Sequence, residues 1–313
     1  MPISGEAGGL LSIWQLTGLV GHDSLALQQD ERFAMAWNET DRAKYAVIRE
    51  RYASDLSDQE FALLQPLLPG IKPRGRKPTD TRSILNALFY MIRCGCPWRY
   101  LPKDFPPFTT VQNRFYAWRD SGLWEQILAV MVMAVRQAEG KRAVPTVAIV
   151  DSQSVKTTEA GGPRGYDAGK KLNGRKRHVA VDTLGLPIKC HVTAADVQDR
   201  DALPALLKAV SQKSPWVELA FVDGGYAGDE TQRAAFEASR IKLSVVKRSD
   251  RTVNGFVVLP KRWIVERTLG WLNRSRRLAK DFEAMVESSR TWLMLALGFL
   301  LLRRLGRDYK GTG

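Results

Sequence analysis

Two short apolar runs in this chain each end in an aspartate. Residues 147–150 read Val-Ala-Ile-Val and are followed by Asp151, and residues 219–222 read Leu-Ala-Phe-Val and are followed by Asp223. Such runs are typical of buried strands. A carboxylate at the end of a buried strand is costly unless it has a partner such as a metal ion. The two runs therefore predict strands that carry metal-binding carboxylates at their ends.

A third acidic candidate is Glu266, within Lys-Arg-Trp-Ile-Val-Glu-Arg at 261–267. A helical glutamate is often only solvated, and Arg262 lies four residues earlier as an ion-pair partner. The apolar neighbours of Glu266 indicate instead that this side of the helix is partly buried. Carboxylate oxygens suit Mg²⁺ or Mn²⁺, and two such ions can hold both reacting oxygens of a phosphoryl transfer. Nucleic-acid strand chemistry is therefore the first hypothesis.

The composition favours a polyanionic partner. The 313 residues include 47 Lys and Arg against 33 Asp and Glu, which gives a formal net charge of +14 and a pI of about 9.8. Such an excess of positive charge attracts DNA or RNA. With 44% hydrophobic residues, the chain is too apolar to be a disordered basic tail.

Cysteine usage and hydropathy exclude two other classes of protein. The three cysteines, Cys94, Cys96 and Cys190, are too few and too irregularly spaced for a disulfide scaffold, and they form no zinc motif. The most apolar stretch, 291–302, is shorter than the roughly 20 residues of a membrane span and predicts a buried helix. We read no signal peptide in the N-terminal residues. A cytoplasmic protein with no membrane segment is expected.

The pattern along the chain divides it into three parts: an N-terminal extension and linker over 1–53, a helical domain over 54–140, and a domain of strands and helices over 141–313. In the helical domain, Ser57 and Glu60 form a capping box, and Thr79 or Asp80 begins a helix that runs to about Arg93. Further helices are expected at about 110–120 and 123–139. Short helices with tight turns are compatible with a helix-turn-helix.

After residue 141 the pattern alternates between strands and helices. Strands are expected at 145–151, 176–182, 187–193, 217–223 and 241–246, and helices at 200–211, 228–239, 261–280 and 287–306. This order, with acidic residues on the first strand, on the fourth strand and on a late helix, resembles a ribonuclease-H-like core. The expected fold is therefore α/β, a ribonuclease-H-like mixed five-stranded sheet flanked by helices, with an all-helical DNA-binding domain before it.

Several linked motifs make the resemblance more specific. In order along the chain they are Val-Asp-Ser-Gln-Ser-Val-Lys at 150–156, Gly-Tyr-Asp-Ala-Gly-Lys-Lys at 165–171, Gly-Arg-Lys-Arg-His at 174–178, Ala-Asp-Val-Gln-Asp-Arg-Asp at 195–201, Phe-Val-Asp-Gly-Gly-Tyr-Ala-Gly at 221–228 and Arg-Trp-Ile-Val-Glu-Arg at 262–267. Together they resemble the DDE transposases of bacterial insertion sequences, in the five-type branch of the insertion sequence four/five superfamily. The wider superfamily has a Tyr and a Lys where this chain has Leu259 and Asn273.

The resemblance implies a transposase that binds terminal inverted repeats, cleaves DNA in a metal-dependent reaction and transfers the strand to target DNA. Asp151, Asp223 and Glu266 would be the catalytic residues and would hold two Mg²⁺ ions, with Mn²⁺ able to substitute. The implied partner is double-stranded DNA, with a homodimer holding both ends, in the bacterial cytoplasm at the nucleoid. Two alternatives are a nuclease of the same fold that cuts without joining, and a non-catalytic DNA-binding regulator.

Candidate DNA contacts fall into three groups. Lys156, Lys170, Lys171, Arg175 and Arg177 form a basic cluster between the first two strands, which either is a solvated loop or grips phosphate beside Asp151. On the helix of Glu266, the basic candidates are Arg262, Arg274, Arg276, Arg277 and Lys280. At the start of the helix at 110–120, Gln112, Asn113 and Arg114 suit the reading of base edges, although a helical bundle with a polar face would show the same pattern.

Four other residues have local explanations. Asp182 is expected to bond the backbone of a hairpin turn, and Asp199 and Asp201 to cap a helix. His178, on the second strand, is either structural or placed near the metal ions and the DNA.

Overall fold

The computed structural model of the chain describes residues 52–70, 79–246 and 261–308. The chain divides into two compact units, residues 1–76 and 77–313. The predicted extension over 1–53 lies outside the described residues except for its last two. In the first unit, the helix α4 (Asp58–Leu64) is followed by the 3₁₀ turn η1 (Gln65–Leu67). The predicted capping box is confirmed, because Ser57 and Glu60 each bond the other's backbone N–H.

The second unit begins with helices. They are α5 (Thr81–Cys94), the 3₁₀ turn η2 (Trp98–Tyr100), α6 (Phe108–Asp120) and α7 (Leu123–Ala138). Asp80 caps α5 by accepting from the backbone N–H groups of Arg82 and Ser83, as predicted. Gly95 ends α5 in the left-handed conformation that glycine adopts without strain. These elements match the predicted helices within two residues.

A mixed sheet forms the centre of the second unit. Its strands are β1 (Val147–Lys156), β2 (Gly165–Asp167), β3 (Leu172–Val181), β4 (Pro187–Ala194), β5 (Leu219–Asp223) and β6 (Lys242–Val246). The five long strands lie in the order β4-β3-β1-β5-β6, with β1 central, antiparallel to β3 and parallel to β5. The short β2 pairs with the start of β3. The predicted five-stranded mixed sheet is therefore confirmed, and β2 is an addition to it.

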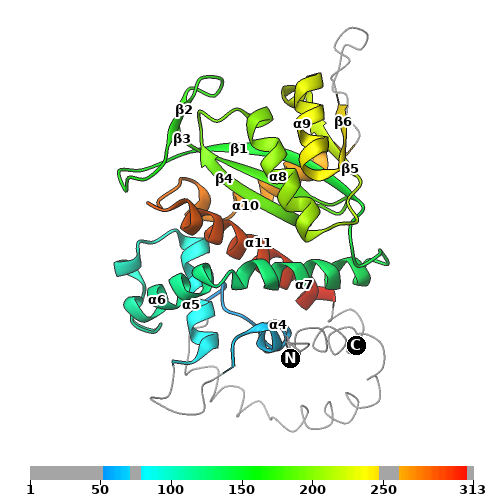
Figure 1. The fold of residues 1–313 in the computed structure, drawn as a ribbon. Coiled ribbons are helices and arrows are strands. Elements are labelled where there is room, and N and C mark those ends of the chain that lie inside the picture. The colour runs from blue at the N-terminus through cyan, green and yellow to red at the C-terminus, as the bar shows by residue number, and fades with distance from the viewer. Residues whose placement is uncertain (1–51, 71–78, 247–260, 309–313) are drawn as a thin grey trace, which may run out of the picture. The chain divides into compact units, whose positions relative to one another are not determined.

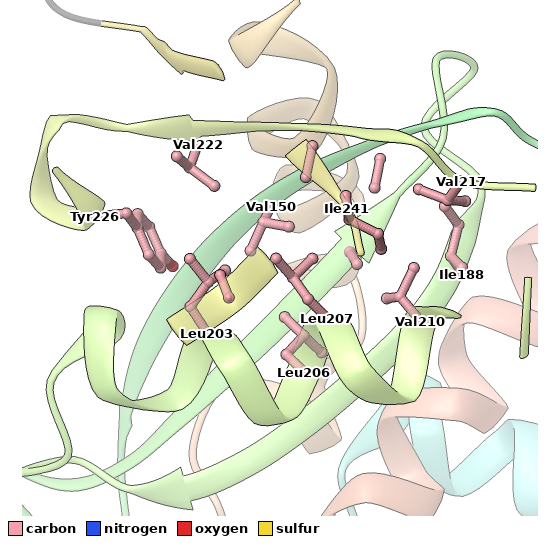
Figure 2. Close-up of a cluster of buried hydrophobic side chains, with 14 residues drawn as sticks. Val150, Ile188, Leu203, Leu206, Leu207, Val210, Val217, Val222, Tyr226 and Ile241 are labelled. Carbon is pink, nitrogen blue, oxygen red and sulfur yellow. The ribbon is translucent and has the colours of Figure 1, made fainter. Parts of the chain in front are cut away.

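Helices cover both faces of this sheet. Figure 1 shows α8 (Asp199–Lys213) and α9 (Asp229–Ser239) in front of the strands and α10 (Arg262–Leu272) behind them. Between α8 and the sheet, leucines of α8 pack on Val150 of β1 and Val222 of β5 (Figure 2). Buried apolar side chains of this kind supply most of the stability of a domain. The predicted fold class is confirmed by this layered arrangement.

The last helix joins the sheet to the helical region. In α11 (Val286–Asp308), Trp292 stacks on Phe115 of α6 with ring centroids 4.6 Å apart, and Phe299 lies 4.7 Å from Phe89 of α5. The helices α5, α6 and α7 thus share one core with α11, inside the second unit. The domain boundary predicted between residues 140 and 141 falls within this unit. In the described part of the chain, no helix has both the length and the apolar character needed to cross a membrane.

Three predicted boundaries differ from the structure. The strand predicted at 176–182 begins earlier, at Leu172. The strand ending at Asp151 continues to Lys156, because β3 pairs with it over its whole second half. The single helix predicted over 261–280 is wrong: α10 ends at Leu272 and is followed by the 3₁₀ turn η4 (Arg276–Leu278). The amide of Asp281 then bonds the carbonyl of Lys156 at 2.8 Å, so the chain runs beside β1 instead of continuing the helix. Tertiary contacts override the helical pattern here.

Candidate active site

The register of the sheet brings two of the predicted carboxylates together. β1 and β5 are parallel neighbours, and their pairing ends two residues before Asp151 and Asp223. Side chains alternate along a strand, and Val150 and Val222 point into the core under α8 (Figure 2). Asp151 and Asp223 therefore point to the opposite face of the sheet, where α10 packs against β1 and β5.

The helix α10 supplies the third carboxylate. Arg262, in its first turn, places a guanidinium nitrogen 3.0 Å from Glu266 Oε1 and 3.8 Å from Asp223 Oδ2. One positive charge thus lies between the carboxylate of β5 and that of α10. Glu266 remains the most accessible of the three, since half of its side chain (52%) is exposed. β1, β5 and α10 thus bring the three acidic residues predicted from the sequence to the same region of the sheet.

The carboxyl group of Asp151 has a raised pKa. Burial, with smaller contributions from the nearby Asp223 and Glu266, raises the pKa of Asp151 to about 6. The amide of Ser152, which donates to Asp151 Oδ1 at 2.7 Å, and the guanidinium of Arg262 act in the opposite direction. A perturbed carboxyl group among other carboxyl groups is a common property of catalytic sites.

The donor set fits a hard divalent cation. Three carboxylates offer only oxygen ligands, as Mg²⁺ and Mn²⁺ prefer. Within the described ranges, no ion pair is formed by the buried Asp151, whereas Arg262 pairs with both Asp223 and Glu266. As placed, no three Asp, Glu, His or Cys side chains among the described residues are close enough to share one ion. Metal binding would therefore require the three carboxylates to come closer together than they are placed.

Comparison with protein families identifies the group to which this site belongs. Residues 142–301 match the family described as transposase DDE domain. The chain belongs to this DDE transposase family. Residues 56–128 of the chain match a second family, described as putative transposase of the IS4/5 family. The resemblance stated from the motifs is thus confirmed, and the family places the chain among enzymes that act on DNA.

Curated relatives match parts of the chain. It is 30% identical over 141 residues to a putative transposase for insertion sequence element IS402 of Burkholderia cepacia, covering 43% of this chain and 65% of the relative. It is 29% identical over 113 residues to an uncharacterized 16.2 kDa protein of the same element, covering 34% and 76%. It is 34% identical over 77 residues to the uncharacterized protein y4sN of Sinorhizobium fredii, covering 24% and 62%. No solved structure matches the chain.

The structure exposes several of the basic residues that the sequence predicted to contact DNA. Lys170 and Lys171 lie at the turn between β2 and β3, Lys156 ends β1, and Arg274 follows α10, all four with exposed side chains. Arg262 is partly exposed and lies between the carboxylates. These positions leave their charges available to a polyanion.

The predicted base-reading residues lie in the first two turns of α6. Asn113 is exposed, whereas Gln112 and Arg114 are half-buried. The amide of Gln112 donates to the hydroxyl of Tyr116 at 3.1 Å, and the guanidinium of Arg114 lies 5.9 Å from the ring centroid of Trp118. Two of the three therefore have partners within their own helix.

Three arginines predicted to contact DNA are buried instead. Arg175 donates to the carbonyls of Pro163, Glu283 and Ala284, and its guanidinium lies 3.2 Å from Asp281. These bonds tie β3 to the segment before α11. The prediction that Arg175 grips phosphate does not fit these contacts.

Arg177 and Arg277 are buried in the same region. Arg177 donates to the carbonyl of Leu278 at 2.7 Å, and burial lowers its pKa to about 10. Arg277 pairs with Glu283 and lies with its guanidinium 4.6 Å from the ring centroid of Trp292. The two arginines hold the chain together, so their predicted contact with DNA does not fit the structure either.

Sequence reasoning missed a polar network behind β1. Asp199 was expected to cap α8, but Gln198 occupies the cap position and makes no side-chain cap bond. The carboxylate of Asp199 accepts instead from the hydroxyl of Ser152 at 2.8 Å, and Lys176 Nζ lies 3.4 Å from it. The available signal was the polar residue directly after Asp151, which alternation places on the opposite face from the site.

Two further local expectations can be compared with their contacts. Asp182 Oδ1 accepts from the amides of Leu184 and Leu186, as expected of a turn residue. His178 is buried in β3 and lies 3.0 Å from the hydroxyl of Thr193, and burial lowers its pKa to about 4. Its contacts match the structural alternative.

Proposed function

We propose that this protein is the transposase of an insertion sequence, which binds terminal inverted repeats, cleaves DNA at the element ends and transfers the cut strand to target DNA. The observation that carries the proposal is the meeting of Asp151, Asp223 and Glu266 from β1, β5 and α10, at a place where burial disfavours the charge of Asp151. The family match and the similarity to the putative IS402 transposase support it.

Asp151, Asp223 and Glu266 would hold two Mg²⁺ ions, for which Mn²⁺ can substitute. When bound, the ions supply an activated attacking oxygen and stabilise the leaving oxygen of the phosphodiester. Burial keeps Asp151 in a fixed orientation, because Ser152 and the packed strand leave it little freedom. Arg262, already between two carboxylates, is positioned to balance their charge and to contact a phosphate nearby.

The proposed DNA contacts follow from exposure. Lys156, Lys170, Lys171 and Arg274 would contact phosphates, since their side chains are exposed and near the sheet that carries the site. On α6, Gln112, Asn113 and Arg114 would read base edges in a major groove. The protein would act as a homodimer that holds both element ends, in the bacterial cytoplasm and associated with the nucleoid.

Single substitutions at the three carboxylates test the proposal. Asp151→Ala, Asp223→Ala and Glu266→Ala should each abolish cleavage and joining while binding to element ends persists, because basic residues carry the binding. Glu237→Ala, at an exposed carboxylate on α9, is the matched control and should cleave normally. If the Glu266→Ala protein nicks DNA with Mg²⁺ at near the normal rate, Glu266 is not the third ligand.

Strand transfer separates the proposal from its closest alternative. A labelled element end incubated with target plasmid and Mg²⁺ should yield a joined product. A protein that cuts the end and never joins it would be a nuclease of the same fold. A protein that binds the end and performs neither reaction would be a regulator.

A further inference from the structure

The segment after α10 runs along the second half of β1. The amide nitrogen of Gln153 lies 3.2 Å from Asn273 Oδ1, and Gln153 is two residues beyond Asp151 on the same side of the strand. Further along, the amide of Asp281 donates to the carbonyl of Lys156 at 2.8 Å, and Thr157 forms a bridge with Asp281. The segment 273–281 therefore begins beside the catalytic carboxylates and leads away from them.

Exposed cations accompany this segment. We call them the basic strip, and they are Arg93, Lys156, Arg274, Arg276 and Lys280. Within residues 52–70, 79–246 and 261–308, no carboxylate forms an ion pair with any of the five. Two acidic residues nearby in the sequence already have other partners: Asp281 pairs with Arg175, and Glu283 pairs with Arg277. Among the described residues, the positive charge of the strip is thus not compensated by an ion pair.

The strip includes a residue from the helical region. Arg93, at the end of α5, donates to the carbonyl of Arg274 at 3.1 Å. The neighbouring Gly95 approaches the backbone of Arg276 so closely that a Cβ there would lie 3.1 Å from the Arg276 carbonyl carbon. The end of α5 and the segment 273–281 are therefore one continuous surface.

The arrangement also holds in place the backbone that carries these charges. Between the exposed Arg274 and Arg276, Ser275 is buried, and the next residue, Arg277, is buried against Trp292. A backbone anchored at alternate residues loses little freedom when its exposed side chains bind a ligand. Like charges fixed side by side repel one another, and a polyanion relieves that repulsion.

We propose that the basic strip binds the phosphate backbone of the DNA duplex whose scissile bond lies at the carboxylates, so that Arg93 of α5 holds DNA beside the catalytic site. The proposal rests on the proposed function for the place of the scissile bond. It adds Arg93 to the candidate DNA contacts and gives the end of α5 a role in gripping the substrate.

A cysteine next to Arg93 can report whether DNA covers the basic strip. Cys94 follows Arg93 and is exposed, whereas Cys96 is half-buried and burial raises its pKa, and Cys190 is fully buried with its pKa raised to about 11. Thiolates are the reactive form, so iodoacetamide should alkylate Cys94 first. A short duplex of arbitrary sequence, added in a chelating buffer at low salt, should slow this alkylation several-fold, and salt should restore it. The variant Cys94→Ser measures the remaining labelling of Cys96.

Substitutions then separate charge from structure. The double variant Arg93→Gln/Arg276→Gln should weaken binding to all sequences alike and reduce the slope of log affinity against log salt by up to about two units. The double variant Arg93→Lys/Arg276→Lys should have the same salt slope as the unchanged protein, because it keeps both charges while losing the guanidinium geometry. Arg233→Gln, at an exposed arginine of α9, is the control and should leave the slope unchanged.

The outcomes distinguish this proposal from the proposed function. Unprotected Cys94 together with an unchanged salt slope in the Gln variant would overturn the strip, even if Asp151→Ala abolishes cleavage. Protection of Cys94 and a reduced slope would support the strip even if the carboxylate variants still cut DNA. A reduced salt slope in Arg93→Lys/Arg276→Lys would also overturn the proposal, because the reduction would then come from a change of fold and not from lost charge.

Discussion

At the scale of single residues, ionisation of Asp151 lowers the free energy of unfolding. Its pKa lies near 6 in the folded protein against an ordinary value of 3.8, with burial as the largest cause. The folded state therefore holds the proton more tightly than the unfolded state. Between these two pH values stability falls as the pH rises, and above about pH 6 the full cost, roughly 3 kcal/mol, is present.

Asp151→Asn should therefore stabilise the metal-free protein at about pH 8, by up to roughly 3 kcal/mol, since the amide has the same shape and no charge. The gain should shrink towards pH 5, where the aspartate is largely protonated. Thermal unfolding of chelator-treated protein at the two pH values measures it. An equal difference at both would show that the charge of Asp151 is not the cause.

Replacing a buried arginine, unlike replacing Asp151, is expected to destabilise the protein. Arg175→Met should destabilise the protein by about 3–5 kcal/mol, because it leaves the buried Asp281 without its cationic partner and three carbonyls without the donor that Arg175 supplies. Lys170→Met, at an exposed lysine of the same basic cluster, should change stability by less than about 0.5 kcal/mol. Urea unfolding of the two variants provides the comparison. Equal losses would mean that the cluster behaves as one surface.

These residues also show what could be predicted from the sequence. Asp151 and Asp223 were identifiable because the strand that positions each of them immediately precedes it in the chain. The burial of Arg175 and Arg177 was not, because their partners, Glu283, Ala284 and Leu278, lie about a hundred residues later. A local pattern of basic residues is the same for a solvated loop and for a buried network.

At the scale of elements, the turn between β3 and β4 is clamped to α10. The hydroxyl of Thr268 donates to the carbonyl of Gly185 at 2.9 Å, and Arg267 donates to the carbonyl of Leu184 at 2.9 Å. Both donors adjoin Glu266 on α10. The contact thus fixes where the helix, and with it the third carboxylate, lies on the sheet.

Gly185→Ala should loosen this clamp. Gly185 has φ +82°, and a Cβ there would lie 2.8 Å from Thr268 Oγ1. Gly161 has the same φ with open space around it, so Gly161→Ala carries only the cost of a left-handed backbone, roughly 1–2 kcal/mol. Gly185→Ala should unfold at a lower temperature than this control and need more Mg²⁺ for half-maximal cleavage. Identical metal requirements in the two variants would contradict a positioning role.

The boundaries of elements could be predicted where local sequence signals determine them. They were predicted wrongly where tertiary packing determines them. The Asp80 cap and the Ser57 capping box are short-range chemistry, and both formed as expected. The helix predicted over 261–280 failed because no Gly or Pro marks its break after Leu272. The break arises from the bonds that bring Asp281 to β1, which no window of sequence contains.

At the scale of the whole second unit, the helical region and the sheet depend on α11. Its side chains, with Trp292 and Phe299 among them, are buried against α5, α6 and α7. A fragment of residues 142–313 would expose this apolar face to water, whereas 77–313 would keep it covered. We expect the shorter fragment to aggregate or bind a hydrophobic dye, and the longer one to unfold cooperatively. A soluble, cooperatively folding 142–313 would instead support two independent domains.

The place of α11 at the end of the second unit has a consequence for the making of the protein. The ribosome releases the chain from its N-terminal end first, so α5, α6 and α7 emerge long before the helix that completes their core. Asp151 emerges early as well, but Glu266 and the clamp that positions it follow more than a hundred residues later. Contacts this distant in sequence form slowly. We therefore expect the three carboxylates to be unassembled on a nascent chain from which α10 and α11 have not yet emerged.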